Sequence, residues 1–269
     1  MEWESLPEGC IATILSLTTP EDTCRLSLVS KTFYSAAQYD AVWATFLPHD
    51  YSSIISRSDS GSSLLSNSPS LKSLYLALSD RPILIDNATK SFQLEKKSGK
   101  KCYMLAARAL HIVWGDTPAY WNWKSLTESR FPEVAELLDV CWLEIRGNIN
   151  TNALSANTCY AAYLVFKMIR ASGFFRHPVE LSVDVLGVQS TIKEVCLNPN
   201  VEGRPVPNRF RGLQRPNLRS DGWLEIKMGE FFNSGLENEV QMSVMEIKGG
   251  HWKRGLIIEG IEVRPKEGN

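Results

Sequence analysis

Two apolar stripes at helical spacing occupy the first 50 residues, and they constrain the fold more than any other feature of the chain. Ile11, Ile14 and Leu15 lie at positions i, i+3 and i+4, so they share one face of a helix. Thr19 is a favourable N-cap and Pro20 a favourable first residue for the helix that follows. A second apolar stripe covers residues 26–33, and aromatic side chains at 43 and 46 close the segment. We therefore predict a small all-α domain over residues 1–48.

The next segment is rich in serine, with eleven serines between positions 52 and 73. This composition offers little apolar surface to bury, which is typical of a loop or a flexible linker. Helical spacing over residues 71–78 indicates one short helix at its end. We therefore expect three regions: the helical domain 1–48, a serine-rich linker 49–80, and a third domain over 81–267.

The third region alternates between apolar and polar side chains. Leu224, Ile226 and Met228 alternate with Glu225 and Lys227, a period of two that predicts a half-buried strand. The same pattern, or a run richer in aliphatic and aromatic residues, occurs at 141–146, 160–169, 240–244 and 257–263. Many short strands joined by polar turns favour an antiparallel β-sandwich. Residues 198–220, rich in proline and arginine, are expected to form a long basic loop.

Charge and cysteine content limit the functional classes. The net charge is −1, which gives no global attraction to nucleic acid or to an anionic membrane, and two basic residues against seven acidic ones make residues 1–50 acidic. The six cysteines are widely and irregularly spaced, so we expect reduced, buried thiols of an intracellular protein. The first residues lack a signal-peptide pattern, and no run approaches the roughly 18 apolar residues of a membrane span.

Catalytic motifs are missing from the sequence. The four histidines are far apart, and the zinc-protease, paired-cysteine, nucleophile-elbow and phosphate-loop patterns do not occur. We therefore expect a non-catalytic protein without a metal or another cofactor.

The N-terminal pattern resembles a known module. Leu6-Pro7, the helical stripes, Thr19-Pro20 and Val29-Ser30-Lys31-Thr32-Phe33 follow one another as in an F-box, the module that docks on the Skp-type adaptor of an SCF ubiquitin ligase. The alternative is a generic amphipathic helical hairpin, whose stripes face only its own core. The resemblance implies core or adaptor contacts for Leu6, Pro7, Ile11, Ile14, Leu15, Pro20, Leu28, Val29, Phe33 and Trp43, with Leu6 and Trp43 as candidate hot spots.

A second resemblance covers about residues 82–265. Its motifs include the segments 109–116, 140–147, 222–226, 249–256 and 260–265. They read ALHIVWGD, VCWLEIRG, GWLEI, GGHWKRGL and GIEVRP. Together they look like the phloem protein 2 domain, the Nictaba-like lectin module of plants. The resemblance implies a jelly-roll-like sandwich, a place in the cytoplasm and nucleus, and binding of oligosaccharides that carry N-acetylglucosamine.

An aromatic cluster in this region is the candidate sugar site. In the family that the chain resembles, two tryptophans seven positions apart are associated with sugar binding, and Trp114 and Trp121 have this spacing. Trp123 and Asp116 complete the candidate site, because aromatic rings pack on the apolar face of a pyranose while polar groups bond its hydroxyls. The alternative is that these tryptophans are core residues with locally bonded indole groups.

These features together predict the substrate-recognition subunit of an SCF-type E3 ubiquitin ligase. The expected partners are the Skp-type adaptor and cullin on one side and a glycan or glycoprotein client on the other, with no nucleic acid. Two alternatives stay open. One is a carbohydrate-binding lectin that does not act in a ligase, and the other is a receptor whose β domain recognises a protein surface.

Overall fold

The computed structural model describes residues 6–185, 192–198 and 208–266. These residues fall into two compact units. We call residues 6–87 with 91–102 the helical unit, and residues 88–90 with 103–266 the β unit. Each unit is described by itself. The boundaries 48, 80 and 267 given above stay predictions.

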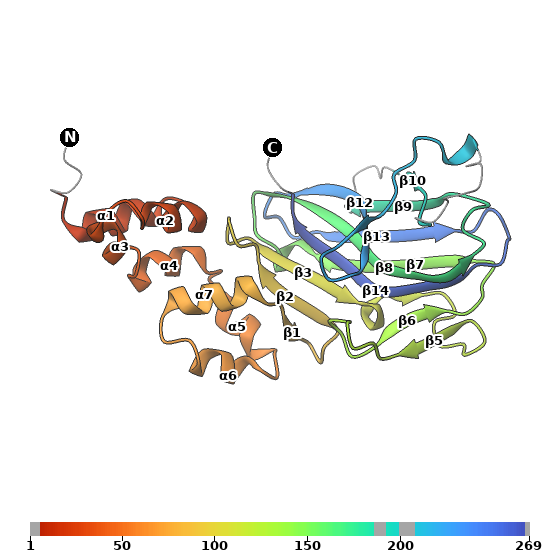
Figure 1. Ribbon diagram of the computed structural model, residues 1–269, viewed down its shortest axis with the longest axis horizontal. Helices are drawn as coiled ribbons and strands as arrows, with labels where there is room; N and C mark the ends of the chain where they lie inside the picture. Colours follow the sequence, from red (N-terminus) through yellow and green to blue (C-terminus); the bar gives the residue numbers. More distant parts are fainter. Residues whose placement is uncertain (1–5, 186–191, 199–207, 267–269) are drawn as a thin grey trace. The chain divides into compact units, whose positions relative to one another are not determined.

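The helical unit contains seven helices, shown in red to orange in Figure 1. The expected cap at Thr19 is confirmed, because Thr19 Oγ1 accepts a hydrogen bond of 3.1 Å from the Asp22 N–H. Ser30, which was not predicted as a cap, accepts one of 3.3 Å from the Phe33 N–H through its Oγ. Strands β1 (Ile83–Ile85) and β2 (Lys90–Leu94) follow the helices. The helices are α1 (Glu8–Ser16), α2 (Pro20–Leu26), α3 (Lys31–Ala36), α4 (Asp40–Phe46), α5 (Tyr51–Ser56), α6 (Gly61–Ser66) and α7 (Leu71–Asp80).

The serine-rich segment differs from the expected loop. It forms α5 and α6, and the short helix expected at 71–78 is α7. Two isoleucines, Ile54 and Ile55, are 2% and 0% exposed and anchor α5. Serine hydroxyls bond carbonyls one turn earlier, as Ser56 does to Ser53 at 2.8 Å. The prediction was wrong because a few buried aliphatic side chains and locally bonded hydroxyls are enough to hold short helices within a folded unit.

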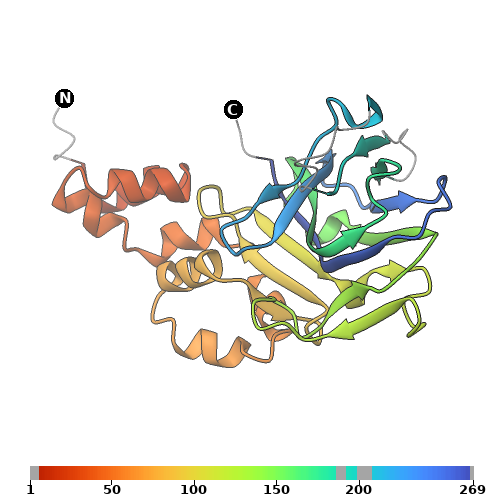
Figure 2. The same ribbon diagram turned by 45° about the vertical axis from the view of Figure 1, so that its right-hand side comes forward.

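The β unit contains two antiparallel sheets, which Figures 1 and 2 show as two layers. The first has the order β3-β14-β8-β12-β11, with β6 also paired to β14 and β5 paired to β6. The second has the order β10-β9-β13-β7-β4. Strands of the first sheet are β3 (Lys101–Ala106), β5 (Trp121–Lys124), β6 (Val134–Leu137), β8 (Thr158–Ser172), β11 (Asn217–Leu218), β12 (Leu224–Asn233) and β14 (Arg254–Pro265). Those of the second are β4 (His111–Ile112), β7 (Leu143–Asn150), β9 (Val179–Val185), β10 (Lys193–Val195) and β13 (Glu239–Glu246).

Glycines mark where the two layers approach each other. A Cβ on Gly147 of β7 would lie 3.3 Å from the side chains of Leu105 and Ile261, and a Cβ on Gly229 of β12 would lie 2.9 Å from Val183. The layers therefore pack closely at these positions. The five strands predicted from alternation lie in β7, β8, β12, β13 and β14, so an antiparallel, sheet-rich region after N-terminal helices is confirmed.

The cysteines correct another expectation. All six are thiols outside any disulfide, but Cys10, Cys24 and Cys159 are exposed and only Cys196 is buried. Cys10, Cys24 and Cys159 occupy outward positions of α1, α2 and β8, which the spacing in the sequence does not distinguish from inward ones. Of the expected basic loop, residues 199–207 lie outside the described residues. No described helix is both long and apolar enough to cross a bilayer.

Candidate functional site

The residues expected to contact an adaptor divide into two sets by their exposure. The first set reaches solvent: Leu28 is 85% exposed, Val29 67% and Ile14 40%, Pro7 is also exposed, and Leu6 is half-buried. The other five are buried: Ile11, Leu15, Pro20, Phe33 and Trp43. The buried set forms the core of the helical unit, so only the first set can meet a partner without unfolding.

Trp43 lies inside the helical unit. Its side chain is 0% exposed, its indole N–H donates a 2.8 Å hydrogen bond to the Ala37 carbonyl, and its ring lies 5.2 Å from that of Tyr75. Burial raises the pKa of Tyr75, whose hydroxyl bonds the Glu95 and Lys96 carbonyls. Trp43 therefore stabilises the unit, and its suggested role as a hot spot has no exposed surface to support it.

A fixed turn presents Leu28 and Val29 to solvent. The Leu28 N–H donates to the Arg25 carbonyl at 3.1 Å and the Val29 N–H to the Leu26 carbonyl at 3.0 Å. Ser30 then caps α3, so both aliphatic residues are held between two helices. Leu17, 83% exposed at the end of α1, was missed because it lies outside the stripe that the sequence analysis followed. We call Ile14, Leu17, Leu28 and Val29 the exposed aliphatic set. Ile14 lies on α1 and the other three lie in turns at helix ends, and such exposed aliphatic side chains suit docking by apolar packing.

In the β unit, Trp114 is the exposed tryptophan of the candidate sugar site. It is 44% exposed and has a φ of 58°, an uncommon conformation for a residue with a side chain. Its carbonyl accepts a hydrogen bond of 2.9 Å from the Thr117 N–H, which closes the turn that also carries exposed Asp116. The Tyr120 ring lies 5.3 Å from the Trp114 ring at an angle of 42°. These two rings offer an aromatic surface at the turn.

Trp121 and Trp123 support this turn from β5. The indole N–H of Trp121, which is 3% exposed, donates to the Val113 carbonyl at 3.2 Å. The indole N–H of Trp123 donates to the Gly115 carbonyl at 2.9 Å, and the Arg108 guanidinium stacks 3.7 Å from its ring. Both indoles thus bond the carbonyls on either side of Trp114. The structure brings the four predicted residues together but leaves Trp114 and Asp116 as the exposed ones.

A carboxylate lies beside this turn. The Glu144 carbonyl on β7 accepts a hydrogen bond of 3.0 Å from the Val113 N–H, and its carboxylate accepts one of 2.8 Å from the Trp142 indole. The bond from Trp142, with Arg146 nearby, lowers the pKa of Glu144 although partial burial opposes this. Exposed Trp114 with half-buried Tyr120, on a turn hydrogen-bonded to the strand that carries Glu144, has groups of the kind that bind a polar ring with an apolar face.

Comparison with known proteins identifies the family. An F-box-like family model matches residues 3–49, and the phloem protein 2 model matches residues 100–265. The chain belongs to the plant F-box proteins that carry a phloem protein 2 domain. F-box protein PP2-B10 of Arabidopsis thaliana is 46% identical over 268 residues, covering 98% of this chain and 94% of the relative. F-box protein SKIP3 of the same plant is 40% identical over 267 residues, covering 97% of this chain and 88% of the relative.

Proposed function

We propose that this chain is the substrate-recognition subunit of an SCF-type E3 ubiquitin ligase. Its helical unit would dock on a Skp-type adaptor, and through it on a cullin, while the β unit holds a client. The chain would supply no chemistry of its own, because holding a client near a ubiquitin-charged enzyme raises the effective concentration for transfer. Activity in the cytoplasm and nucleus is part of this proposal.

The observation that carries the proposal is the exposure of Leu28 and Val29 within a segment that matches the F-box-like model. Two aliphatic side chains at 85% and 67% exposure cost solvation free energy in the free protein. A rigid turn that keeps them exposed is explained by a partner that covers them. The F-box match gives that partner its class.

For the client, we propose a glycan or glycoprotein that binds at Trp114 and Tyr120. The support is chemical: the exposed Trp114 ring, with the half-buried Tyr120 ring 5.3 Å away and Glu144 on the strand bonded to Val113, fits the apolar face and the hydroxyls of a pyranose. The phloem protein 2 match agrees with a lectin-like module, and we further propose that its two sheets form a jelly-roll-like sandwich.

The test is co-purification of the full chain with a recombinant Skp-type adaptor and cullin. We expect a stable ternary complex on gel filtration. A folded chain that elutes apart from the adaptor would overturn the ligase proposal.

The exposed Trp114 keeps one second candidate open, a carbohydrate-binding lectin that does not act in a ligase. Glycan-array binding without adaptor binding would favour this candidate. Adaptor binding without any array signal would favour a receptor for a protein surface.

A further inference from the structure

A buried lysine joins two loops at one end of the β unit. The Lys253 side chain is 1% exposed and pairs with the buried carboxylate of Glu246. Its ammonium also donates hydrogen bonds of 2.9 Å to the Cys141 carbonyl and 2.8 Å to the His251 carbonyl. An ammonium has three protons to donate, so Lys253 is fully bonded, and its buried charge is compensated.

The two carbonyls that Lys253 holds come directly before two exposed tryptophans. Trp142 follows Cys141 and is 41% exposed, and Trp252 follows His251 and is 54% exposed. Val140 and Lys253 also exchange backbone hydrogen bonds of 3.0 and 2.8 Å. Two tryptophans far apart in the sequence are therefore mounted on one rigid base rather than on independent loops.

Trp142 also connects this base to the Trp114 turn. Its indole N–H bonds the Glu144 carboxylate, and the Glu144 backbone carbonyl accepts the Val113 N–H. Glu144 therefore lies between the residue next to Trp114 and the indole of Trp142. Hydrogen bonds through Glu144 thus link the Trp142 segment to the turn that carries Trp114.

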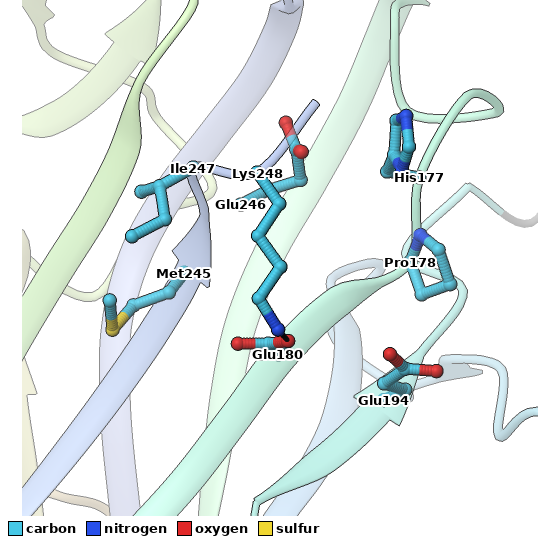
Figure 3. Close-up of a pocket in the computed structure, with 8 residues that line it drawn as sticks. All are labelled: His177, Pro178, Glu180, Glu194, Met245, Glu246, Ile247 and Lys248. Carbon is cyan, nitrogen blue, oxygen red and sulfur yellow. Dashed lines mark hydrogen bonds and ion pairs between the residues drawn. The ribbon is translucent and has the colours of Figure 1, made fainter. Parts of the chain in front are cut away.

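A stacked histidine pair includes His251, the residue before Trp252. His177 stacks on His251 with ring centroids 5.4 Å apart. Beside His177, a small pocket of about 40 Å³ opens at the ends of β9 and β13. Figure 3 shows Lys248 reaching Glu180 across this pocket, with Glu246 and His177 at its other end. Its lining residues are His177, Pro178, Glu180, Glu194, Met245, Glu246, Ile247 and Lys248.

We propose that Trp142 and Trp252 form a second pyranose-binding subsite, so that the β unit binds an extended oligosaccharide rather than a single terminal sugar. The inference rests on the proposed glycan client and extends it. Exposed indoles supply the surface for the apolar face of the ring, and Glu144 with the histidine pair supplies partners for hydroxyl groups. One oligosaccharide would then make a weak sugar–aromatic contact at each of two subsites, which raises the overall affinity.

The test compares two lengths of one probe, a disaccharide and a hexasaccharide of N-acetylglucosamine, by calorimetric titration of the full chain. We expect Trp142→Ala combined with Trp252→Ala to weaken hexasaccharide binding about tenfold or more and to leave disaccharide binding unchanged. Trp114→Ala should weaken the binding of both. Phe232→Ala is the matched control, because Phe232 is an aromatic residue of the β unit with 56% exposure.

The outcomes separate this inference from the proposed function on which it rests. Wild-type affinity for the hexasaccharide in a folded double variant would overturn the second subsite alone, as would equal losses for both sugars. If the folded wild-type chain binds neither sugar, the glycan proposal fails and the subsite with it. Trp142→Phe with Trp252→Phe keeps aromatic rings at both positions and should retain most hexasaccharide binding, which also guards against misfolding of the alanine variant.

Discussion

The indole N–H of Trp121 donates a 3.2 Å hydrogen bond to the carbonyl oxygen of Val113, directly before the residue that faces solvent at this turn. Trp121 is 3% exposed and Trp114 is 44% exposed. Two tryptophans seven positions apart therefore have different tasks. One holds the turn and the other is free to contact a ligand.

This division predicts opposite effects for two alanine substitutions. Trp121→Ala should destabilise the β unit by about 3–5 kcal/mol, because it removes a large buried side chain and leaves a cavity. Trp114→Ala should change the unfolding free energy by less than about 1 kcal/mol and weaken glycan binding. Urea denaturation and a glycan array measure the two effects. A folded Trp114→Ala variant with full array binding would contradict the role of Trp114.

A buried carboxylate makes the β unit sensitive to acid. Glu262 is 7% exposed and accepts hydrogen bonds from Arg219 at 2.7 Å and Arg264 at 2.8 Å. Burial alone would raise the pKa of Glu262, but Arg219 and the neighbouring arginines hold it below the ordinary 4.5. Because the folded pKa is below the unfolded one, the stabilisation is complete above pH 4.5 and is lost as the pH falls through the lower, folded value.

Glu262→Gln should therefore destabilise the β unit at neutral pH by about 1–3 kcal/mol, since Arg219 and Arg264 lose charge-assisted hydrogen bonds to Glu262 although both keep Glu225 as a partner. It should also flatten the acid side of the stability curve below pH 4.5. Thermal unfolding at pH 7 and at about pH 4 checks both effects. Glu237→Gln, at an exposed position, is the control. An acid dependence identical to the wild type would show that the network does not contribute it.

The helical unit depends on Trp43 for its core. Trp43→Ala removes a fully buried ring together with its hydrogen bond to Ala37 and its contact with Tyr75, so it should destabilise this unit by about 3–5 kcal/mol. Near-ultraviolet circular dichroism on heating follows the loss. Stability equal to the wild type would mean that Trp43 is not a core residue.

Local signals in the sequence were enough for most elements. Thr19 and Ser30 cap helices as helix-start residues do, and the alternation at 224–228 matches β12. The helices α5 and α6 were missed because serine content describes only what a segment cannot bury. Ile54 and Ile55 anchor α5, and a hydroxyl bond such as that from Ser66 to the Ser62 carbonyl lies within α6.

The exposure of the site residues could not be predicted in the same way. A stripe places Val29 and Phe33 on one helical face, yet Val29 lies in a turn between helices and is 67% exposed, while Phe33 is 8% exposed. Likewise, Trp114 differs from Trp121 through hydrogen bonds to backbone atoms at 113 and 115, which arise only when β5 packs beside the turn. The exposure of these side chains therefore depends on tertiary contacts, which the apolar periodicity of the sequence does not reveal.

The most direct test of the central claim is the affinity of the full chain for a Skp-type adaptor when the exposed aliphatic set is altered. We expect Leu28→Asp with Val29→Asp to weaken binding at least about a hundredfold, because each charge must be buried at an apolar interface, without lowering the melting temperature of the helical unit. Leu65→Asp, on α6 with 45% exposure, should bind like the wild type. Wild-type affinity in the Leu28/Val29 variant, or no binding by the wild-type chain itself, would contradict the account.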